Sequence, residues 1–242
     1  MMSDKPAGDA GFDRQREQLV ARLRAQRIAS ERVLAAIAAT PRELFVPPEL
    51  RPLAYDDNAL PIAAGQTISQ PTVVAVMTEA LRVEPNSHVL EIGTGSGYQA
   101  AILAHLARSV VSVEVHPELA EGARRVLATL GIENVEVHVG DGSLGWPDAA
   151  PYDRILVTAA APEIPAALLD QLRPQPGSRL VVPIGGRDFQ SLVAVTWENG
   201  EWVERRGGSV RFVPLRGEAG WSDTEWSTRR HPFSRWRRKH NP

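Results

Sequence analysis

Apolar residues recur along this chain with two different spacings, and the two alternate between residues 72 and 184. Spacings of three and four residues put apolar side chains on one face of a helix, whereas short apolar runs are typical of buried strands. Helices are predicted over 72–81, 98–107, 117–130 and 163–172, and strands over 88–92, 109–115, 134–139, 153–158 and 179–184. Repeated strand–helix units predict a mainly parallel sheet with helices on both faces.

The region before residue 72 has a different pattern. Residues 1–12 have little to bury and are expected to be disordered. A helix is predicted over 13–28, a second one follows Ser30, which can act as its N-cap, and a short one runs from Pro41 to Leu44. An irregular segment is predicted over 49–71, which has prolines at 52, 61 and 71. A loop of that length inside a compact domain usually has a function.

The C-terminal part also leaves the alternation. Short apolar runs over 190–197 and 201–213 flank Asn199-Gly200. This dipeptide is typical of the tight turn between two antiparallel strands. We therefore expect the parallel sheet to end in an antiparallel C-terminal hairpin.

Length and composition fit one α/β domain. The chain has 242 residues, 43% of them hydrophobic, and no apolar stretch approaches the ~20 residues that cross a bilayer. Its first residues are polar and lack the apolar run of a signal peptide. It has no cysteine, which excludes disulfides, thiolate metal sites and cysteine nucleophiles. We expect a cytoplasmic protein.

Charge is distributed unevenly. The chain has 27 basic and 29 acidic residues, but residues 229–242 contain six basic residues and no acidic one, so the remainder has a net charge of −8. An acidic body binds polyanions poorly, so nucleic-acid binding would depend on this tail. The extension 218–242 also contains Trp221, Trp226 and Trp236. It is either an arm for nucleic acid or an acidic partner, or a solvated extension whose tryptophans dock partly on the body, and we favour the second.

The strongest chemical signal is the stretch Val89 to Tyr98, with the sequence VLEIGTGSGY. It predicts a strand, a glycine turn and a helix start, where backbone N–H groups and the helix dipole attract a polar ligand. Tyr98 takes the place of the third glycine of the dinucleotide-binding fingerprint, which argues against a nicotinamide oxidoreductase. The turn resembles the cofactor loop of S-adenosylmethionine-dependent methyltransferases.

Three acidic residues accompany this turn. Glu114 ends the next predicted strand, where a carboxylate can accept hydrogen bonds from both ribose hydroxyls or simply be solvated. Asp141, in Gly140-Asp-Gly142, can accept from an adenine amino group or be a turn residue. Glu91 either orients the methionine part of the cofactor or begins the turn. Together with the glycine turn these acids indicate a nucleoside site more strongly than any of them alone.

Other chemistries lack their motifs. The chain has no G-x-S-x-G elbow, no H-E-x-x-H helix and no G-x-x-x-x-G-K-[ST] phosphate loop. Its six histidines do not have the spacing of metal ligands, so no metal is expected. His138 alternates with two valines in a predicted strand, which indicates a structural role.

The second informative stretch is LPIAAGQTISQP, from Leu60 to Pro71. Gly65 permits a tight turn, Gln66, Thr67 and Ser69 supply polar groups, and Pro71 can begin a helix. On these grounds alone, Ser69 could be an N-cap and nothing more.

With its other motifs, the chain resembles the protein-L-isoaspartate (D-aspartate) O-methyltransferase family over about residues 19–217. The stretches that carry the resemblance are 60–71, 89–98, 140–147, 150–153, 157–162 and 212–215. The resemblance implies a Rossmann-like methyltransferase fold over 13–217, in which 13–71 supplies N-terminal helices and a substrate-side loop and 72–217 the cofactor-binding core. It also implies methyl transfer from S-adenosylmethionine to the α-carboxylate of L-isoaspartyl residues in damaged proteins, followed by collapse of the ester to a succinimide and hydrolysis to aspartate.

The family's functional residues match positions of this sequence. The serine that matches Ser69 is the active-site residue of the family. The resemblance, with the residues discussed above, places the cofactor against Gln66, Thr67, Ile68, Ser69, Glu91, Gly93, Thr94, Gly95, Gly97, Glu114, Gly140, Asp141 and Gly142. It places an extended substrate peptide against the backbone of Ala64, Gly65, Val182 and Pro183. The stretch Ile62 to Gly65 lacks a second glycine that is often found in the family, which is expected to narrow this groove slightly.

The chemistry agrees with the available residues. A carboxylate is already ionised at neutral pH, so the reaction needs no general base. Alignment of the reacting groups can supply about 7–11 kcal/mol in favourable models. Two alternatives remain open: a methyltransferase-fold protein that binds cofactor and recognises a partner, and a nucleic-acid methyltransferase, which the acidic body and the absence of an N/D-P-P-Y/F motif argue against. We expect a monomer that acts on isoaspartyl proteins and peptides.

Overall fold

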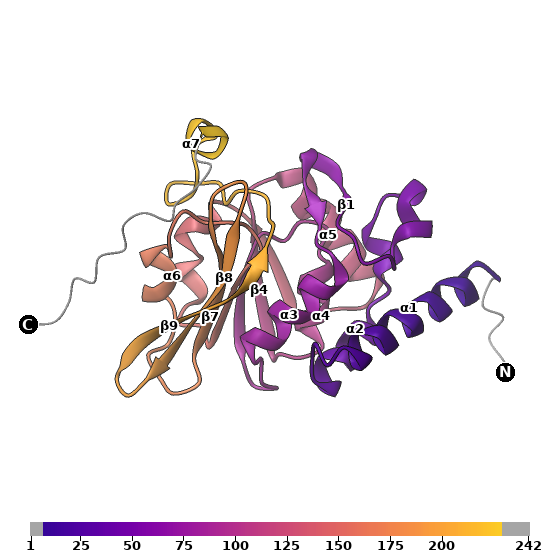
Figure 1. Ribbon diagram of the computed structural model, residues 1–242, viewed down its shortest axis with the longest axis horizontal. Helices are drawn as coiled ribbons and strands as arrows, with labels where there is room; N and C mark the ends of the chain where they lie inside the picture. Colours follow the sequence, from indigo (N-terminus) through magenta and orange to yellow (C-terminus); the bar gives the residue numbers. More distant parts are fainter. Residues whose placement is uncertain (1–6, 229–242) are drawn as a thin grey trace, which may run out of the picture.

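A seven-stranded sheet runs through the centre of the molecule (Figure 1). The computed structural model describes residues 7–228. Neighbouring strands are parallel from β5 through β7, whereas β8 is antiparallel to both β7 and β9. Across the sheet the strands are β5 (Val135–Val139), β4 (Ser109–Glu114), β3 (His88–Ile92), β6 (Arg154–Val157), β7 (Arg179–Gly185), β8 (Gln190–Glu198) and β9 (Glu201–Val210). The predicted parallel sheet with an antiparallel C-terminal hairpin is confirmed.

The helices between the strands also follow the prediction, with two differences in length. They are α3 (Pro71–Leu81), α4 (Tyr98–Ala104), α5 (Pro117–Thr129) and α6 (Ala166–Asp170). α4 ends three residues before the expected end at residue 107. The helix expected over 163–172 is much shorter, because Pro165 precedes its first turn and a proline disfavours helical backbone in the residue before it. β9 likewise ends at Val210, three residues before the expected end of the hairpin.

The N-terminal helices differ from the prediction at their start. Helix α1 (Ala7–Ala25) begins before Asp13, so residues 7–12 are helical where disorder was expected. Phe12 packs against the main hydrophobic cluster, which stabilises this extra turn. Residues 1–6 of the expected disordered segment lie outside the described residues. In α2 (Glu31–Ala39), Ser30 occupies the N-cap position, but its hydroxyl donates to Glu79 of α3 instead of capping its own helix.

The two faces of the sheet are covered unequally. Side chains on one face, among them Val89, Leu156 and Val181, join a cluster with residues of α1 to α5. Their neighbours along the same strands, among them Leu90 and Ile155, point to the other face and pack with α6 and the segment around Tyr152. This alternation follows from the two-residue period of a strand. It gives the molecule helices on both faces, as expected.

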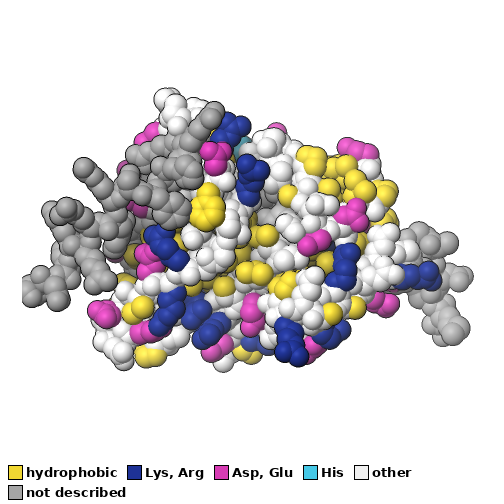
Figure 2. Space-filling view, viewed as in Figure 1, with side chains coloured by type: hydrophobic (Ala, Val, Ile, Leu, Met, Phe, Trp, Pro, Cys, Tyr) yellow, Lys and Arg dark blue, Asp and Glu magenta, His cyan; other side chains and the backbone are white. Residues whose placement is uncertain are grey.

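The irregular segment between α2 and α3 is built of short elements. It contains the 3₁₀ turns η1 (Arg42–Phe45), η2 (Pro48–Leu53) and η3 (Ala63–Gly65), and a two-stranded ribbon of β1 (Leu60–Pro61) and β2 (Thr67–Ile68). Figure 2 shows hydrophobic side chains gathered over this part of the molecule, at the upper right, and Leu53 is 44% exposed. The chain here rises above the sheet and forms one wall of the cavity described below.

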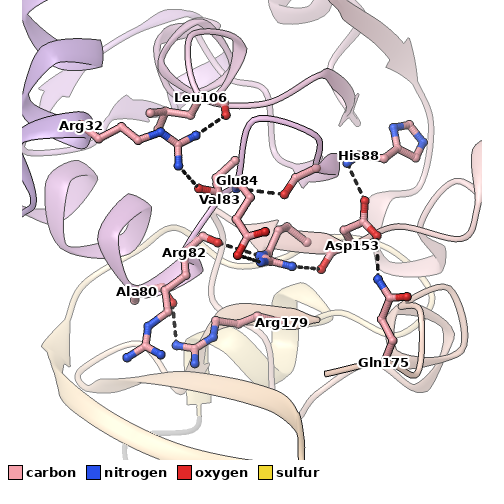
Figure 3. A network of polar contacts seen from close by, with 12 residues as sticks. Arg32, Ala80, Arg82, Val83, Glu84, His88, Leu106, Asp153, Gln175 and Arg179 are labelled. Carbon is pink, nitrogen blue, oxygen red and sulfur yellow. Dashed lines mark hydrogen bonds and ion pairs between the residues drawn. The ribbon is translucent and has the colours of Figure 1, made fainter. Parts of the chain in front are cut away.

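The edge of the sheet at which the parallel strands begin, the amino edge, is held by arginines (Figure 3). Arg32 donates to the carbonyls of Val83 and Leu106, Arg154 to that of Arg82, and Arg179 to that of Ala80. These carbonyls lie at or just beyond the C-terminal ends of α3 and α4, where they have no partner within the helix and where the helix dipole favours cations. The network therefore ties the end of α3 to the starts of β6 and β7, and ties α2 to the ends of α3 and α4.

The chain beyond β9 returns to the sheet. The Leu215 N–H donates to the Ala160 carbonyl, the Leu215 carbonyl accepts from the Trp221 N–H, and Trp221 is only 2% exposed. Helix α7 (Asp223–Thr228) follows, in which Trp226 packs against the main hydrophobic cluster. The start of the extension 218–242 is thus packed on the body. Trp236 and residues 229–242, which would form the arm of the less favoured alternative, lie outside the described residues.

Candidate functional site

A cavity lies at the opposite, carboxyl edge of the sheet, where β3 and β6 are neighbours. The strand order reverses at this point, because β3 leads to β4 on one side and β6 follows on the other, and ligands of open α/β sheets bind at such points. Most of the cavity lining comes from residues 66–69, the glycine turn after β3, the end of β4, and residues 212–216. Nine of the thirteen residues predicted to bind cofactor line it.

The glycine turn depends on backbone that other residues rarely adopt. Gly93, Gly95 and Gly97 have φ angles of 93°, 54° and 89°. A side chain at Gly93 would come within 2.5 Å of the Thr158 hydroxyl, and one at Gly97 within 3.0 Å of Ala123. The turn can therefore pack closely on β6 and α5 only with glycine, which leaves its other side open to the cavity.

Glu114 lies at the cavity wall, as predicted. One of its carboxylate oxygens accepts from the backbone N–H of Gly95 at 2.8 Å and the other from that of His116 at 3.0 Å. These two bonds fix the plane of the carboxylate, and each oxygen keeps a second lone pair for another donor. The geometry fits a group that offers two neighbouring hydroxyls, as a ribose does.

Glu91 lies beneath the turn and not in the cavity wall. Its side chain is fully buried, Oε2 accepts from the Ser112 hydroxyl, and Oε1 has no hydrogen-bond partner. Burial raises the pKa of Glu91 to about 8, with the nearby Glu114 charge adding to the rise and the Ser112 hydrogen bond opposing it. Thr94 shares the network, since its hydroxyl lies 2.6 Å from that of Ser112.

Asp141 is engaged with the protein itself. Its Oδ1 accepts from the backbone N–H and the hydroxyl of Ser143, and its Oδ2 accepts from the N–H of Glu218 at 2.7 Å. Gly142 lines the cavity, whereas Asp141, Gly140 and Gly97 do not. Asp141 thus caps its turn and holds the start of the C-terminal extension beside the cavity.

The substrate-side loop brings Gln66, Thr67, Ile68 and Ser69 into the cavity wall together. The interpretation of Ser69 as an N-cap is wrong, because Gln70 occupies that position and Pro71 begins α3. The Ser69 carbonyl accepts from the guanidinium of Arg42 at 2.8 Å. The serine is therefore positioned through its backbone and lines the cavity between the loop and the glycine turn.

The four residues expected to hold a substrate peptide lie outside this cavity. Ala64 and Gly65 form η3, next to the cavity wall in sequence, and Ala64 has a left-handed φ of 55°. Val182 and Pro183 lie within β7, and the Pro183 carbonyl already accepts from the N–H of Ala161. Their peptide-binding role stays a prediction.

Several cavity residues were not singled out from the sequence. Thr158 follows β6 and donates from its hydroxyl to the Gly93 carbonyl at 2.6 Å, which holds the turn against β6. Tyr98, Gln99 and residues 212–216 also line the cavity. Thr158 had a usable signal, because it ends a strand of the parallel sheet as Glu114 does. Residues 212–216 come from a distant part of the chain; 212–215 carry part of the family resemblance, but nothing in the sequence placed them at the cavity.

Within residues 7–228, no cluster of three or more histidine, aspartate or glutamate side chains is arranged to hold a metal ion. No helix in that range combines the length and apolar character needed to cross a bilayer. His138, expected to be structural, stacks on Trp146 with 4.2 Å between ring centroids.

Comparison with known proteins identifies the family. The model of the protein-L-isoaspartate(D-aspartate) O-methyltransferase family matches residues 14–220. The chain belongs to this family. A protein-L-isoaspartate O-methyltransferase of Dictyoglomus thermophilum is 52% identical over 212 residues, which cover 88% of this chain and 96% of the relative. One of Methanoculleus marisnigri is 54% identical over 209 residues, covering 86% and 94%.

Solved structures of methyltransferases share the fold. A protein-L-isoaspartate O-methyltransferase with 32% identity has a TM-score of 0.75, covering 85% of this chain and 67% of that one. A putative member from Plasmodium falciparum, solved in complex with S-adenosyl-L-homocysteine, has a TM-score of 0.72 at 23% identity, covering 83% and 98%. The second likeness concerns the fold alone.

Proposed function

We propose that this protein is a repair enzyme that transfers a methyl group from S-adenosylmethionine to the α-carboxylate of L-isoaspartyl residues in damaged proteins and peptides. The observation that carries the proposal is the joint presence, around one cavity, of the family's serine segment and a glycine turn with its acidic partner. Membership in the family supports the substrate class. The methyl ester then collapses to a succinimide, whose hydrolysis returns part of the residue to aspartate.

The cavity suits the proposed cofactor, which supplies an electrophilic methyl group on a sulfonium. Glu114 would accept hydrogen bonds from the ribose hydroxyls with the lone pairs that its two backbone donors leave free. Gly93 and Gly95 line the cavity and carry no side chain, so the cofactor would approach the backbone of the turn closely there. Gln66, Thr67 and Ile68 would contact its methionine end. Asp141 would contribute by holding its own turn, because its carboxylate already binds Ser143 and Glu218.

The residues of the chain would then orient and desolvate a group that is already reactive. The substrate carboxylate is ionised at neutral pH, so no side chain has to remove a proton. Ser69 would donate a hydrogen bond that directs one carboxylate oxygen toward the methyl group. Buried apolar side chains in the wall, Ile68, Met77 and Phe212, would exclude water from the reacting atoms. Orientation of this kind accounts for much of the acceleration in comparable reactions.

The decisive experiment uses two peptides that differ only in an isoaspartyl or an aspartyl linkage. With labelled S-adenosylmethionine, we expect a base-labile methyl ester on the isoaspartyl peptide alone. Equal labelling of both peptides would contradict the proposed specificity. A folded chain that binds S-adenosylhomocysteine but labels neither peptide would favour the partner-recognition alternative instead.

Ser69→Ala tests the catalytic assignment. Loss of one orienting hydrogen bond is expected to lower kcat/KM for the isoaspartyl peptide by about 10- to 100-fold, while the Kd of S-adenosylhomocysteine changes little. Ser209→Ala is a suitable control, because Ser209 is an exposed residue of β9 and lies outside the cavity wall. Unchanged turnover of Ser69→Ala would remove Ser69 from the mechanism.

We further propose that the enzyme is a cytoplasmic monomer. A chain without cysteine does not need an oxidising compartment for its stability, which supports the location. Light scattering of the purified protein tests the monomer, and fractionation of the source cells tests the location.

A further inference from the structure

Arg42 is the largest of the fully buried side chains and has no exposed surface. It is the first residue of η1, between α2 and the substrate-side loop. An arginine is rarely buried completely unless its charge is paired, because burial of an unpaired charge is costly. The contacts of this side chain therefore need an explanation.

Arg42 joins three segments that are distant in sequence. Its Nε donates to the carbonyl of Ala54 at 2.7 Å, and one terminal nitrogen donates to the carbonyl of Ser69 at 2.8 Å. The guanidinium carbon lies 4.8 Å from the centroid of the Tyr98 ring, within the range of a cation–π contact. Tyr98 begins α4 directly after the glycine turn and lines the cavity. One side chain thus links the serine segment to the cofactor side of the site.

The same turn makes a second contact with Tyr98. The Phe45 ring, at the other end of η1, meets the Tyr98 ring edge to face with centroids 5.4 Å apart. It also lies 3.7 Å from the position that a side chain at Gly97 would take. Both ends of η1 therefore contact the Tyr98 ring, and Phe45 also contacts the glycine turn. A displacement of Arg42 would move both the serine segment and the start of α4.

The charge of Arg42 is not neutralised nearby. Within the described part of the chain it makes no ion pair, and its second terminal nitrogen is buried without a hydrogen-bond partner. The closest acids have other partners: Glu43 accepts from the Tyr55 hydroxyl, and Asp57 accepts from Gln70 and from Thr72. Burial lowers the pKa of Arg42, but a guanidinium remains charged at neutral pH.

We propose that Arg42 is a positioning residue for methyl transfer: it holds Ser69 in register with the cofactor turn and gives the substrate end of the cavity a buried positive charge. The inference rests on the proposed function, since that charge matters for an anionic acceptor. A cation in a medium of low polarity attracts a carboxylate more strongly than one in water does. Arg42 acts through Ser69 and Tyr98 and does not itself contact the reacting atoms.

The experiment compares Arg42→Met, which removes the charge and the donors, with Arg42→Lys, which keeps the charge but cannot bind both carbonyls in the same way. Arg154→Met is the matched control, because Arg154 is also buried and also binds a main-chain carbonyl, but at the amino edge. For each variant we would measure kcat and KM for an isoaspartyl peptide, the Kd of S-adenosylhomocysteine, the Tm, and amide hydrogen exchange around residues 54 and 69.

We expect Arg42→Met to raise KM about tenfold and to lower kcat about tenfold, and Arg42→Lys to restore KM but not kcat. In both, the Kd of S-adenosylhomocysteine should change less than the kinetic constants, and exchange should quicken around residues 54 and 69. If Arg42→Met fails to fold, the split between kcat and KM in Arg42→Lys carries the test.

Two results would overturn the inference. One is a folded Arg42→Met enzyme with wild-type kcat and KM. The other is an equal loss of activity in Arg154→Met at equal loss of Tm, which would reduce Arg42 to a contributor to stability. Failure of the proposed function is distinct, because the wild-type protein would then not methylate the peptide; hydrogen exchange in Arg42→Met would still report whether Ser69 is held.

Discussion

The two edges of the sheet use the same chemical device for different purposes. At the amino edge, Arg154 and Arg179 donate to carbonyls at the end of a helix, and Glu84 lies 3.7 Å from Arg154. At the carboxyl edge, Arg42 donates to carbonyls of an irregular loop, and the acids near it, Glu43 and Asp57, have other partners. Guanidinium groups at the amino edge hold the scaffold, whereas the one at the carboxyl edge holds a segment that lines the cavity. Burial of an arginine therefore does not by itself indicate function. The indication comes from its partners: whether the carbonyls that it binds belong to a scaffold helix or to a segment that lines the cavity.

The largest expected effect is at the carboxyl edge. Glu114→Ala should weaken binding of S-adenosylhomocysteine about 100-fold or more, because hydrogen bonds to a charged acceptor are each worth about 1.5–3 kcal/mol. Isothermal calorimetry measures this. Glu118→Ala removes a nearby exposed acid outside the cavity wall and should leave binding unchanged. Equal affinities of the two variants would mean that Glu114 only closes its own turn.

The corresponding change at the amino edge should affect stability instead. Arg154→Met leaves the Arg82 carbonyl without its donor and is expected to lower the free energy of unfolding by about 3 kcal/mol. Urea denaturation measures this. Arg205→Met, which breaks an exposed pair with Glu198, should have a much smaller effect. Turnover of folded Arg154→Met should equal that of the wild type; a selective loss of turnover would erase the distinction between the edges.

The buried Glu91 at the carboxyl edge is expected to make the stability of the folded protein depend on pH. Its pKa is about 8 in the folded protein and 4.5 in a free side chain, so between these values the folded protein keeps a proton that the unfolded chain releases. This contribution to stability is complete below pH 4.5 and is lost as the pH rises through about 8. Glu91→Gln has no such proton. Its Tm should therefore gain on that of the wild type as the pH is raised, and parallel Tm profiles would contradict the raised pKa.

The smallest effect concerns the loop beside the cavity. Ala64 has a left-handed φ of 55°, where glycine is less strained. Ala64→Gly is expected to raise the free energy of unfolding by about 0.5 kcal/mol, after the greater freedom of glycine in the unfolded chain is subtracted. Ala63→Gly, at a neighbour without positive φ, should lower it. Chemical denaturation of the two variants distinguishes strain at Ala64 from general loosening of the loop.

Much of this architecture could be predicted from the sequence. The five parallel strands begin and end within one residue of their expected positions, because four of them are mainly apolar and β5 alternates apolar and polar residues. The glycine turn and Glu114 could be assigned for a related reason: both lie next to strand ends, whose order along a parallel sheet brings them together.

The remaining features depend on contacts between distant segments. The local sequence around Arg42 does not predict that its partners are Ala54, Ser69 and Tyr98. Residues 212–216 reach the cavity only because β8 and β9 turn the chain back across the sheet. The sequence predicted Asp141 either as an adenine acceptor or as a turn residue, but not that its carboxylate also binds the backbone of Glu218.

The contacts of the Asp141 carboxylate show that the folded domain extends beyond its last strand. Asp141 accepts a hydrogen bond from the backbone N–H of residue 218, Ser143 accepts one from that of residue 219, and the Trp221 side chain is buried. A chain that stopped at residue 217 would lose both hydrogen bonds and the Trp221 side chain, and the apolar surface that the indole covers would be exposed. Trimming, tagging or fusion at this end should therefore be planned beyond Trp221, even though the last strand is complete at Val210.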